Sequence, residues 1–252
     1  MEKYIQNFST FKKAIVYDFK LGDGGIGDYL KFFMIILVHC MNNNIQIYCK
    51  FNNLEIQKYI KFKYDFFNIT NDQISKLKNV TTKRANMYYG INSCYTGNVK
   101  LNEVFVLDEK TIKSNIDIII PTLPKNYISI HLRLGDKFLE VDKKFVKSKN
   151  DIREYSITKL YSFIEANKSR NIIFLCDNKQ FKLKLKEKYG SILNITNSEI
   201  GHTSFSNTQE KQIVDAITEF YILSNSHTIY AASKSGFSEM ASKFNDIKYV
   251  AI

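Results

Sequence analysis

The chain has 252 residues, of which 36 are Lys or Arg and 25 are Asp or Glu, so its formal net charge at pH 7 is +11. Its 44% apolar and 24% charged residues exclude an intrinsically disordered chain, and its ten Gly and four Cys exclude a collagen-like protein and a disulfide scaffold. This length allows one large domain or two small ones.

The most apolar run, residues 32–41, is interrupted by His39 and is shorter than the roughly 20 residues that a membrane-spanning helix needs. We therefore predict no membrane span. The first residues contain no apolar core of signal-peptide length, so we expect a cytoplasmic protein with reduced cysteines. The cysteines show no Cys-x-x-Cys spacing and no His at a ligand offset, so no metal site is predicted.

The positive charge is compatible with a polyanionic partner. A nucleic-acid-binding protein would gather its basic residues on one face, with aromatic side chains between them. An enzyme for a phosphorylated substrate needs only a few cations in one cleft. The lysines here are scattered, and the stretch 182–188 alternates with apolar residues as on a solvated helix face. Nucleic acid is therefore not the favoured partner, although charge alone does not decide.

In the first half, a β-branched run at 14–17 is followed by the glycine cluster 22–27. From Asp28 onward apolar residues recur at helical spacing up to Leu37, and 45–49 alternates as a strand. This order of strand, glycine loop, helix and strand predicts a βαβ unit. The stretch 50–115 is predicted as mixed helix and loop.

Both prolines lie in one short stretch, 121–124, which we interpret as a rigid connector between domains 1–122 and 123–252. The second half alternates strands with helices. Its predicted strands are 127–132, 171–176 and 227–231, and its predicted helices are 152–167, 181–189, 213–223 and one beginning at Ser238. Such alternation is typical of a parallel sheet covered on both faces. We expect an α/β protein of two Rossmann-like halves that face a central cleft.

In parallel sheets, ligands bind beyond the carboxyl ends of the strands, and four loops meet that condition. The first, Gly22-Asp-Gly-Gly-Ile-Gly27, matches the Gly-x-Gly-x-x-Gly pattern, whose amides at a helix start can hold phosphate. The acidic residue expected about 20 positions later is missing, and Asp28 stands where a P-loop requires Lys. A tight turn is the alternative explanation.

The second loop, His131-Leu-Arg-Leu-Gly-Asp-Lys137, contains Arg133, whose fork-shaped guanidinium can bind a phosphate through two hydrogen bonds. Asp136 could order this loop. A salt bridge at the strand end explains the same residues equally well. In the third loop, Asp177 and Asn178 could accept hydrogen bonds from ribose or base, and a helix N-cap is an equally good explanation.

The fourth loop, Ser233-Lys-Ser-Gly-Phe-Ser238, precedes a helix, so its hydroxyls and helix-start amides suit a pyrophosphate. Helix capping alone would explain Ser238. Each of these signals is ambiguous singly, but four phosphate-compatible loops at four strand ends are much less so.

Together, GGIGD, HLRLGDK, LCDN and the late block from Glu219 to Ser238 occur in an order that resembles the fucosyltransferase superfamily. That group includes α1,2-, α1,6- and protein O-fucosyltransferases and the bacterial Nod-factor enzymes. The resemblance spans about residues 22–244. It implies a GT-B fold, metal-independent inverting transfer, no cofactor, and a GDP-sugar donor held by the carboxyl-terminal half.

Carried over to this chain, the resemblance makes Arg133 the donor-phosphate arginine and Asp177 the acid near the guanosine. Further donor contacts are expected from the same loops, at Gly24, Gly25, Gly27, His131, Asp136, Lys137, Asn178, Ser233, Ser235, Gly236, Phe237 and Ser238. The chain departs from the family pattern at four positions, namely Asp28 for Asn, Leu134 for Arg, Glu219 for Asp and Gly236 for Ser.

Inverting transfer needs a base for the acceptor hydroxyl and positive charge for the leaving diphosphate. Arg133 supplies that charge, and the base is predicted among Asp23, Asp28 and Glu140. We therefore expect an enzyme that moves fucose from GDP-fucose to a glycan hydroxyl. The alternatives are another donor, such as a different GDP-hexose or UDP-xylose, a non-catalytic glycan- or nucleotide-binding relative, and a basic nucleic-acid-binding protein.

Overall fold

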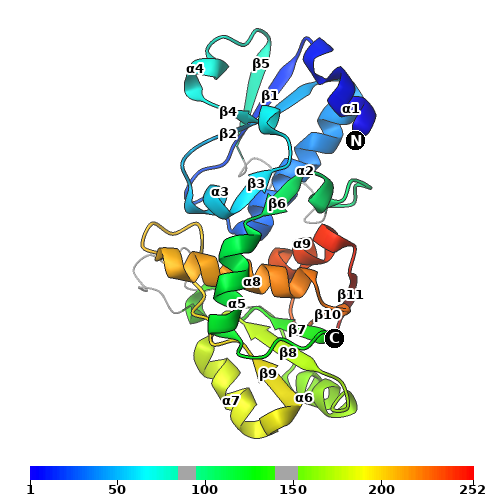
Figure 1. The fold of residues 1–252 in the computed structure, drawn as a ribbon, viewed down its shortest axis with the longest axis vertical. Helices are drawn as coiled ribbons and strands as arrows, with labels where there is room; N and C mark the ends of the chain where they lie inside the picture. The colour runs from blue at the N-terminus through cyan, green and yellow to red at the C-terminus, as the bar shows by residue number, and fades with distance from the viewer. Residues whose placement is uncertain (85–94, 140–152) are drawn as a thin grey trace.

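The computed structural model describes residues 1–84, 95–139 and 153–252. Two parallel sheets lie one above the other along the long axis of the molecule, and helices fill the space between them (Figure 1). The predicted α/β class is therefore confirmed. Glu140 and Cys94 lie outside the described residues, whereas Cys40, Cys49 and Cys176 are buried free thiols.

The upper sheet has the strand order β4-β2-β1-β5, and all of its neighbouring strands are parallel. Its strands are β1 (Ala14–Asp18), β2 (Gln46–Lys50), β4 (Asn68–Ile69) and β5 (Val80–Arg84). The long helix α2 (Ile26–Asn43) connects β1 to β2, so the predicted βαβ unit is present. Shorter helices complete this half, namely α1 (Glu2–Asn7), α3 (Glu55–Tyr59) and α4 (Asn71–Ile74).

The prediction of mixed helix and loop for 50–115 is wrong in part, because this stretch also contains strands. β4 and β5 join the upper sheet, while β3 (Ile60–Phe62) pairs antiparallel with β6 (Phe105–Leu107). These strands have two to five residues, too few for a regular alternation to be recognised. The aromatic rings of Phe33, Phe62 and Phe105 pack together there, which anchors the small sheet against α2.

The lower sheet has the strand order β11-β10-β7-β8-β9, again with parallel neighbours throughout. Its strands are β7 (Ile128–Leu132), β8 (Ile172–Cys176), β9 (Leu193–Ile195), β10 (Thr228–Ala231) and β11 (Lys248–Ala251). From β7 the chain continues through β8 to β9 at one edge of the sheet, and from β10 it continues to β11 at the opposite edge, so the direction of chain order reverses between β7 and β10. A parallel sheet binds ligands at such a reversal, beyond the carboxyl ends of the two strands.

The helices of the lower half are α6 (Ile157–Ala166), α7 (Lys179–Tyr189), α8 (Glu210–Ser224) and α9 (Gly236–Asn245). The helix predicted from residue 152 in fact begins at Ile157, because Ser156 caps it by accepting a hydrogen bond from the amide of Lys159. Helix α5 (Glu109–Ile119) ends just before the proline connector. The domain boundary after residue 122 stays a prediction.

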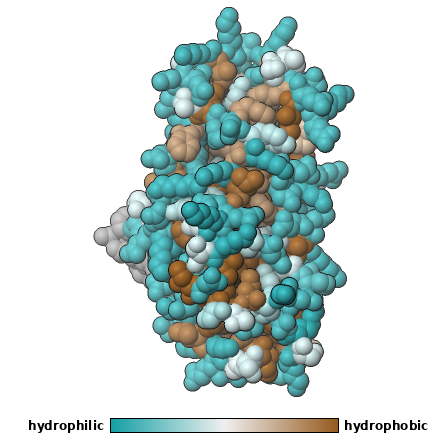
Figure 2. Space-filling model, viewed as in Figure 1, coloured by the Kyte–Doolittle hydropathy of each residue, from teal (hydrophilic) through white to brown (hydrophobic). Residues whose placement is uncertain are grey.

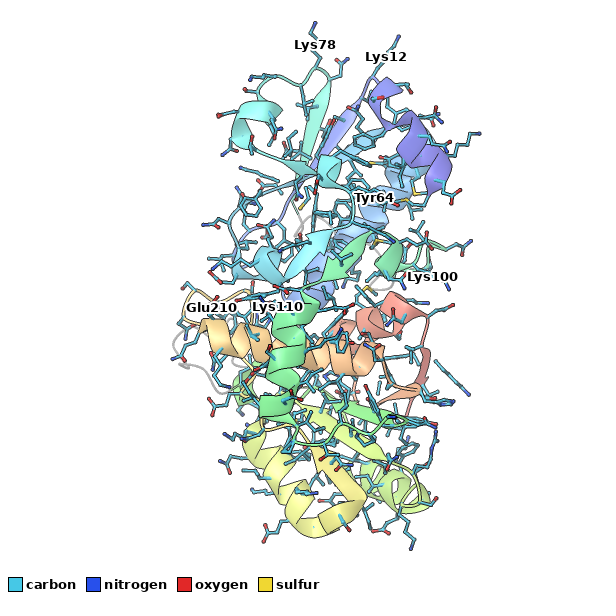
Figure 3. All side chains as sticks on the ribbon, in the orientation of Figure 1. Lys12, Tyr64, Lys78, Lys100, Lys110 and Glu210 are labelled. Atoms are coloured by element: carbon cyan, nitrogen blue, oxygen red, sulfur yellow. The ribbon has the colours of Figure 1, made fainter. Side chains whose placement is uncertain are left out.

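Helices α2, α5, α8 and α9 lie between the two sheets (Figure 1). One cluster of buried apolar side chains runs through them, from Tyr17 and Phe33 in the upper half to Phe220 and Phe244 in the lower half. At the surface of the same junction, the hydroxyl of Tyr59 donates to Glu210, at 2.6 Å, and Figure 3 labels Glu210 at the start of α8. The two halves therefore share one hydrophobic core.

Two helices of different halves touch through their backbones at Gly27. A Cβ atom at Gly27 would lie 2.6 Å from the carbonyl carbon of Gly236 and 2.7 Å from the amide nitrogen of Phe237. No side chain fits at that distance, so Gly27 is what allows the first turn of α2 to lie against the first turn of α9.

The face shown in Figure 2 is largely hydrophilic, with apolar side chains in scattered patches. Within residues 1–84, 95–139 and 153–252, no helix combines the length and the apolar character that a bilayer-spanning segment requires.

We predict that Gly27→Ala lowers the free energy of unfolding by roughly 1–3 kcal/mol, because its methyl group overlaps backbone atoms of α9. The melting temperature should fall by about 2–12 °C, as measured by circular dichroism. Gly236→Ala is the matched control. A Cβ there finds no atom nearer than Lys31 Nζ at 4.0 Å, so its stability should stay within about 0.5 kcal/mol of wild type. Equal effects of the two substitutions would contradict this account.

Candidate functional site

A cavity of about 390 Å³ lies between the two halves. Its walls come from the glycine loop after β1, the loops after β7, β8 and β10, and the long loop 196–209 that leads into α8. Ten of the predicted donor-binding residues line it: Gly24, Gly25, Gly27, His131, Arg133, Asp136, Asp177, Ser235, Gly236 and Phe237. The four loops selected from sequence therefore meet at one place.

Arg133 follows β7 directly, and two carboxylates hold its guanidinium. Nη1 donates to Asp177 at 2.6 Å, and Nη2 makes a shorter contact with Asp136. Asp177 also accepts from the backbone amides of Leu134, at 2.8 Å, and Gly135, at 3.1 Å. The side chain of Arg133 is 15% exposed and that of Asp177 only 3%. The strand-end salt bridge considered as an alternative is thus present, and it fixes the arginine in the cavity wall.

Ser233 joins the loops after β7 and β10 rather than lining the cavity. Its hydroxyl accepts from the amide of Arg133 at 2.8 Å and donates to the carbonyl of Arg133 at 2.9 Å. Ser238 is fully buried, and its hydroxyl donates to the carbonyl of Ser235 at 3.3 Å. Both serines hold the turn in shape, and their predicted donor contacts stay untested.

Two helix N-termini face the cavity from opposite halves. Gly25 is the N-cap of α2 and Ser235 the N-cap of α9, and neither helix is capped by the side chain of its N-cap residue. The first amides of a helix have no intrahelical acceptor and carry a partial positive charge. The close approach at Gly27 brings both sets of amides to one cavity, where they can act on one anion.

His131 is 4% exposed, and its Nδ1 atom has no hydrogen-bond partner. The ring lies beside that of Phe237, with 5.5 Å between centroids. Burial lowers the pKa of His131 to about 4, an effect that the charge of Asp177 partly opposes. The imidazole is therefore neutral at neutral pH, and it contributes a polar lining atom without a positive charge.

The three predicted bases have different positions. Asp28 lines the cavity, where it accepts from the amide of Gly25 at 3.3 Å and pairs with Lys31 at 3.1 Å. Asp23 is buried, accepts from the amide of Lys20 at 2.9 Å, and is not part of the lining. Glu140 lies outside the described residues.

Lys137 and Asn178 do not line the cavity. Lys137 is exposed, with its ammonium 6.0 Å from the ring centre of Phe138. Asn178 caps α7 by accepting from the amide of Phe181 at 2.9 Å, and its side chain also donates to the carbonyl of Phe138. The capping explanation of Asn178 is therefore observed, and its predicted ligand contact stays a prediction.

Sequence reasoning missed the segment Gly201-His-Thr203, which lines the cavity beside Gly25. The adjoining Ser204 ties this loop to the other half, because its hydroxyl accepts from the amide of Gly24 and its carbonyl from the amide of Gly22, both at 3.1 Å. The only signal was its place after β9, and that strand is too short to be recognised from sequence.

Several charged lining residues were also missed. Cations come from Lys31, Arg153 and Lys234, and additional carboxylates come from Glu219 and Glu239. Glu239 is half-buried in the first turn of α9, and its side chain makes no hydrogen bond or ion pair with the described residues. Within the part of the chain that the structure describes, no group of three or more His, Cys, Asp or Glu side chains is arranged to hold a metal ion.

No protein-family model and no curated protein sequence matches the chain. Its fold is similar to that of NodZ α1,6-fucosyltransferase soaked with GDP-fucose, with a TM-score of 0.54 and 10% identity over 92% of this chain and 93% of that chain. POFUT1 in complex with GDP is similar to the same degree, with a TM-score of 0.54 and 10% identity over 96% and 99% of the two chains.

These similarities confirm that the fold is GT-B, in the form seen in fucosyltransferase structures. The resemblance recognised in the sequence motifs is therefore matched by a structural one that spans nearly the full chain. At 10% identity the likeness establishes the fold alone, so the chemistry has to be argued from the cavity.

We predict that His131 makes stability fall as the pH is lowered. The unfolded chain binds a proton at this residue below about pH 6.5, whereas the folded chain does so only near pH 4, so stability is complete above 6.5 and lost between these values. The loss attributable to His131 should reach about 3 kcal/mol. Chemical denaturation from pH 7 to 4 should give a flatter profile for His131→Gln, whereas His39→Gln, at an exposed position, should follow wild type. Parallel profiles for all three proteins would contradict the assignment.

Proposed function

We propose that the chain is an inverting, metal-independent glycosyltransferase that moves fucose from GDP-fucose to a hydroxyl group of a glycan. One observation carries this proposal: Arg133 and the N-termini of α2 and α9 meet at a single cavity between two parallel sheets. The similar structures were solved with GDP or GDP-fucose, which supports the choice of donor. The partners are thus a nucleotide sugar and a glycan acceptor.

A diphosphate fits the electrostatics of this cavity. Helix-start amides favour anions, and the guanidinium of Arg133 can offer parallel hydrogen bonds to phosphate oxygens. Asp177 and Asp136 hold that guanidinium in place before a ligand arrives, so little side-chain entropy is lost on binding. The same groups stabilise the charge that develops on the leaving diphosphate.

Asp177, predicted as the acid near the guanosine, is engaged by Arg133 and two backbone amides, so we assign the contact with the base to Glu219. The buried carboxylate of Glu219 favours guanine among the common bases. Guanine presents two adjacent donors, N1–H and the N2 amino group, and one carboxylate oxygen can accept from both. Uracil offers one N–H between two carbonyl oxygens, and adenine has an acceptor nitrogen next to its amino group. A site that hydrogen-bonds a particular pair of donors discriminates strongly against a ligand that lacks them.

In the proposed reaction, the acceptor oxygen forms a bond to the anomeric carbon while the bond from that carbon to the β-phosphate oxygen breaks. GDP leaves with the bonding electrons, and a carboxylate takes the proton of the acceptor hydroxyl. Asp23, Asp28 and Glu140 were predicted for this role. We add Glu239, since it lines the cavity and no cation among the described residues neutralises it, whereas Asp28 pairs with Lys31.

A glycan- or nucleotide-binding protein without transfer activity is the second candidate. The position of the predicted bases favours it, because Asp28 is engaged by Lys31 and by the amide of Gly25, and Asp23 does not line the cavity. Donor binding without turnover would be its signature.

We predict that calorimetric titration in the presence of EDTA detects GDP binding and much weaker binding of UDP and ADP. Arg133→Lys should weaken GDP binding by about tenfold to 150-fold, because a lysine keeps the positive charge but cannot donate two parallel hydrogen bonds as the guanidinium does. Arg170→Lys, an exposed arginine outside the cavity, is the matched control and should bind GDP like wild type.

A preference for UDP in this titration would overturn the donor while keeping the fold. If no nucleotide bound and the protein instead bound DNA or RNA in a salt-dependent manner, the proposed function would be wrong.

We predict that Glu239→Gln lowers turnover of GDP-fucose by roughly 10²- to 10⁴-fold, since it removes the proton acceptor while keeping the size of the side chain. GDP release in the presence of an oligosaccharide mixture measures turnover, and GDP affinity should change less than about threefold. The control is Glu187→Gln, at an exposed position of α7. If Glu239→Gln turned over GDP-fucose like wild type, Glu239 would not be the base, and one of the other predicted carboxylates would have that role.

A further inference from the structure

Lys182 departs from the solvated helix face predicted for residues 182–188. It lies on α7 and its side chain is 0% exposed. Its ammonium donates to the hydroxyl of Thr196 at 3.1 Å, to the carbonyl of Ser198 at 3.0 Å and to the hydroxyl of Ser198 at 2.6 Å, and it pairs with Glu219 at 3.2 Å. A buried ammonium is costly, and here its hydrogen bonds and one opposite charge compensate it.

The donors around Glu219 all converge on one carboxylate oxygen. Lys182 contacts Oε1, and the hydroxyls of Thr196 and Ser198 donate to the same atom at shorter distances. No hydrogen bond from the described residues reaches Oε2. Glu219 is only 2% exposed, yet it lines the cavity. The cluster therefore fixes the orientation of the carboxylate and leaves Oε2 without a donor among the described residues.

We propose that Lys182 is a positioning residue for ligand specificity: it pairs with Glu219 and orients its carboxylate, so that Oε2 accepts hydrogen bonds from the donor edge of a guanine base. This inference rests on the proposed function insofar as it assumes a nucleotide in the cavity. It does not depend on which residue is the base or on whether transfer occurs. Lys182 itself lines no part of the cavity.

The physical reason is the orientation of a buried acid. Lys182 supplies the opposite charge at 3.2 Å from Oε1, and without it Glu219 would be buried with no ion-pair partner and with one fewer donor to hold it in place. The hydroxyls of Thr196 and Ser198 then fix the rotation of the carboxylate about its last bond.

The experiment compares the affinities for GDP, inosine diphosphate and UDP by calorimetry. Inosine diphosphate lacks the N2 amino group of guanine, so the GDP-to-inosine-diphosphate ratio reports on the acceptor at Glu219. Lys182→Met should weaken GDP binding by roughly tenfold to 150-fold while changing UDP binding less than about threefold. The ratio of GDP affinity to inosine diphosphate affinity should therefore fall sharply. Lys182→Arg should restore much of the ratio. Lys184→Met, an exposed lysine of the same helix, is the matched control.

Glu219→Gln should lower the ratio to the same extent, and the double variant with Lys182→Met should be no worse than either single variant, because both act through one group. If Lys182→Met does not fold, Thr196→Val combined with Ser198→Ala removes the two orienting hydroxyls and should also reduce the ratio. A uniform loss of affinity for all three nucleotides, or an unchanged ratio, would overturn the role of Lys182 and leave only a structural one.

Failure of the proposed function would be recognised separately in the wild-type protein. If wild type binds no nucleotide, or binds UDP better than GDP, both the donor assignment and the role of Lys182 are wrong. If wild type prefers GDP and Lys182→Met keeps that preference, the result supports the donor assignment and contradicts only the role of Lys182.

Discussion

The backbone contact between α2 and α9 is the constraint on which the rest of the structure depends. Because Gly27 has no side chain, the first turns of two helices from different halves lie against each other, and both direct unpaired amides at one cavity. The apolar cluster behind this contact runs through both halves without interruption. A wider separation would divide the positive ends of the helices between two weaker anion sites and expose apolar surface of α2, α8 and α9.

Two buried ion clusters lie at this cavity, and in each of them a cation forms an ion pair with at least one carboxylate. Arg133 is held by Asp136 and Asp177, and Lys182 by Glu219. Buried ion pairs contribute little net stability, since desolvation offsets their attraction. Their value here is orientation: the guanidinium and the carboxylate Oε2 each have one defined direction before any ligand binds. Pre-organisation of this kind reduces the entropic cost of binding.

Sequence reasoning located half of the residues that line the cavity, because glycines, an arginine and serines at strand ends are local signals. Gly24, Arg133 and Ser235 stand in loops that follow recognisable strands, and parallel sheets bring such loops to one edge. The burial of Lys182 could not be read in the same way, because a lysine at a helical position is normally solvated and its partners come from a distant loop and helix. The contribution of loop 196–209 to the cavity was not predicted, because β9 before it has only three residues and therefore shows no recognisable alternation.

The sharing of one core by both halves has a consequence for how the chain is made. Roughly 190 residues separate the end of α2 from the start of α9. At a synthesis rate of about 5–20 residues per second, α9 is therefore synthesised roughly 10–40 s after α2. During that time α2, which contacts α9 in the finished protein, has no α9 to pack against. A product that stops before residue 236 therefore leaves the first turns of α2 without the helix that covers them in the finished protein.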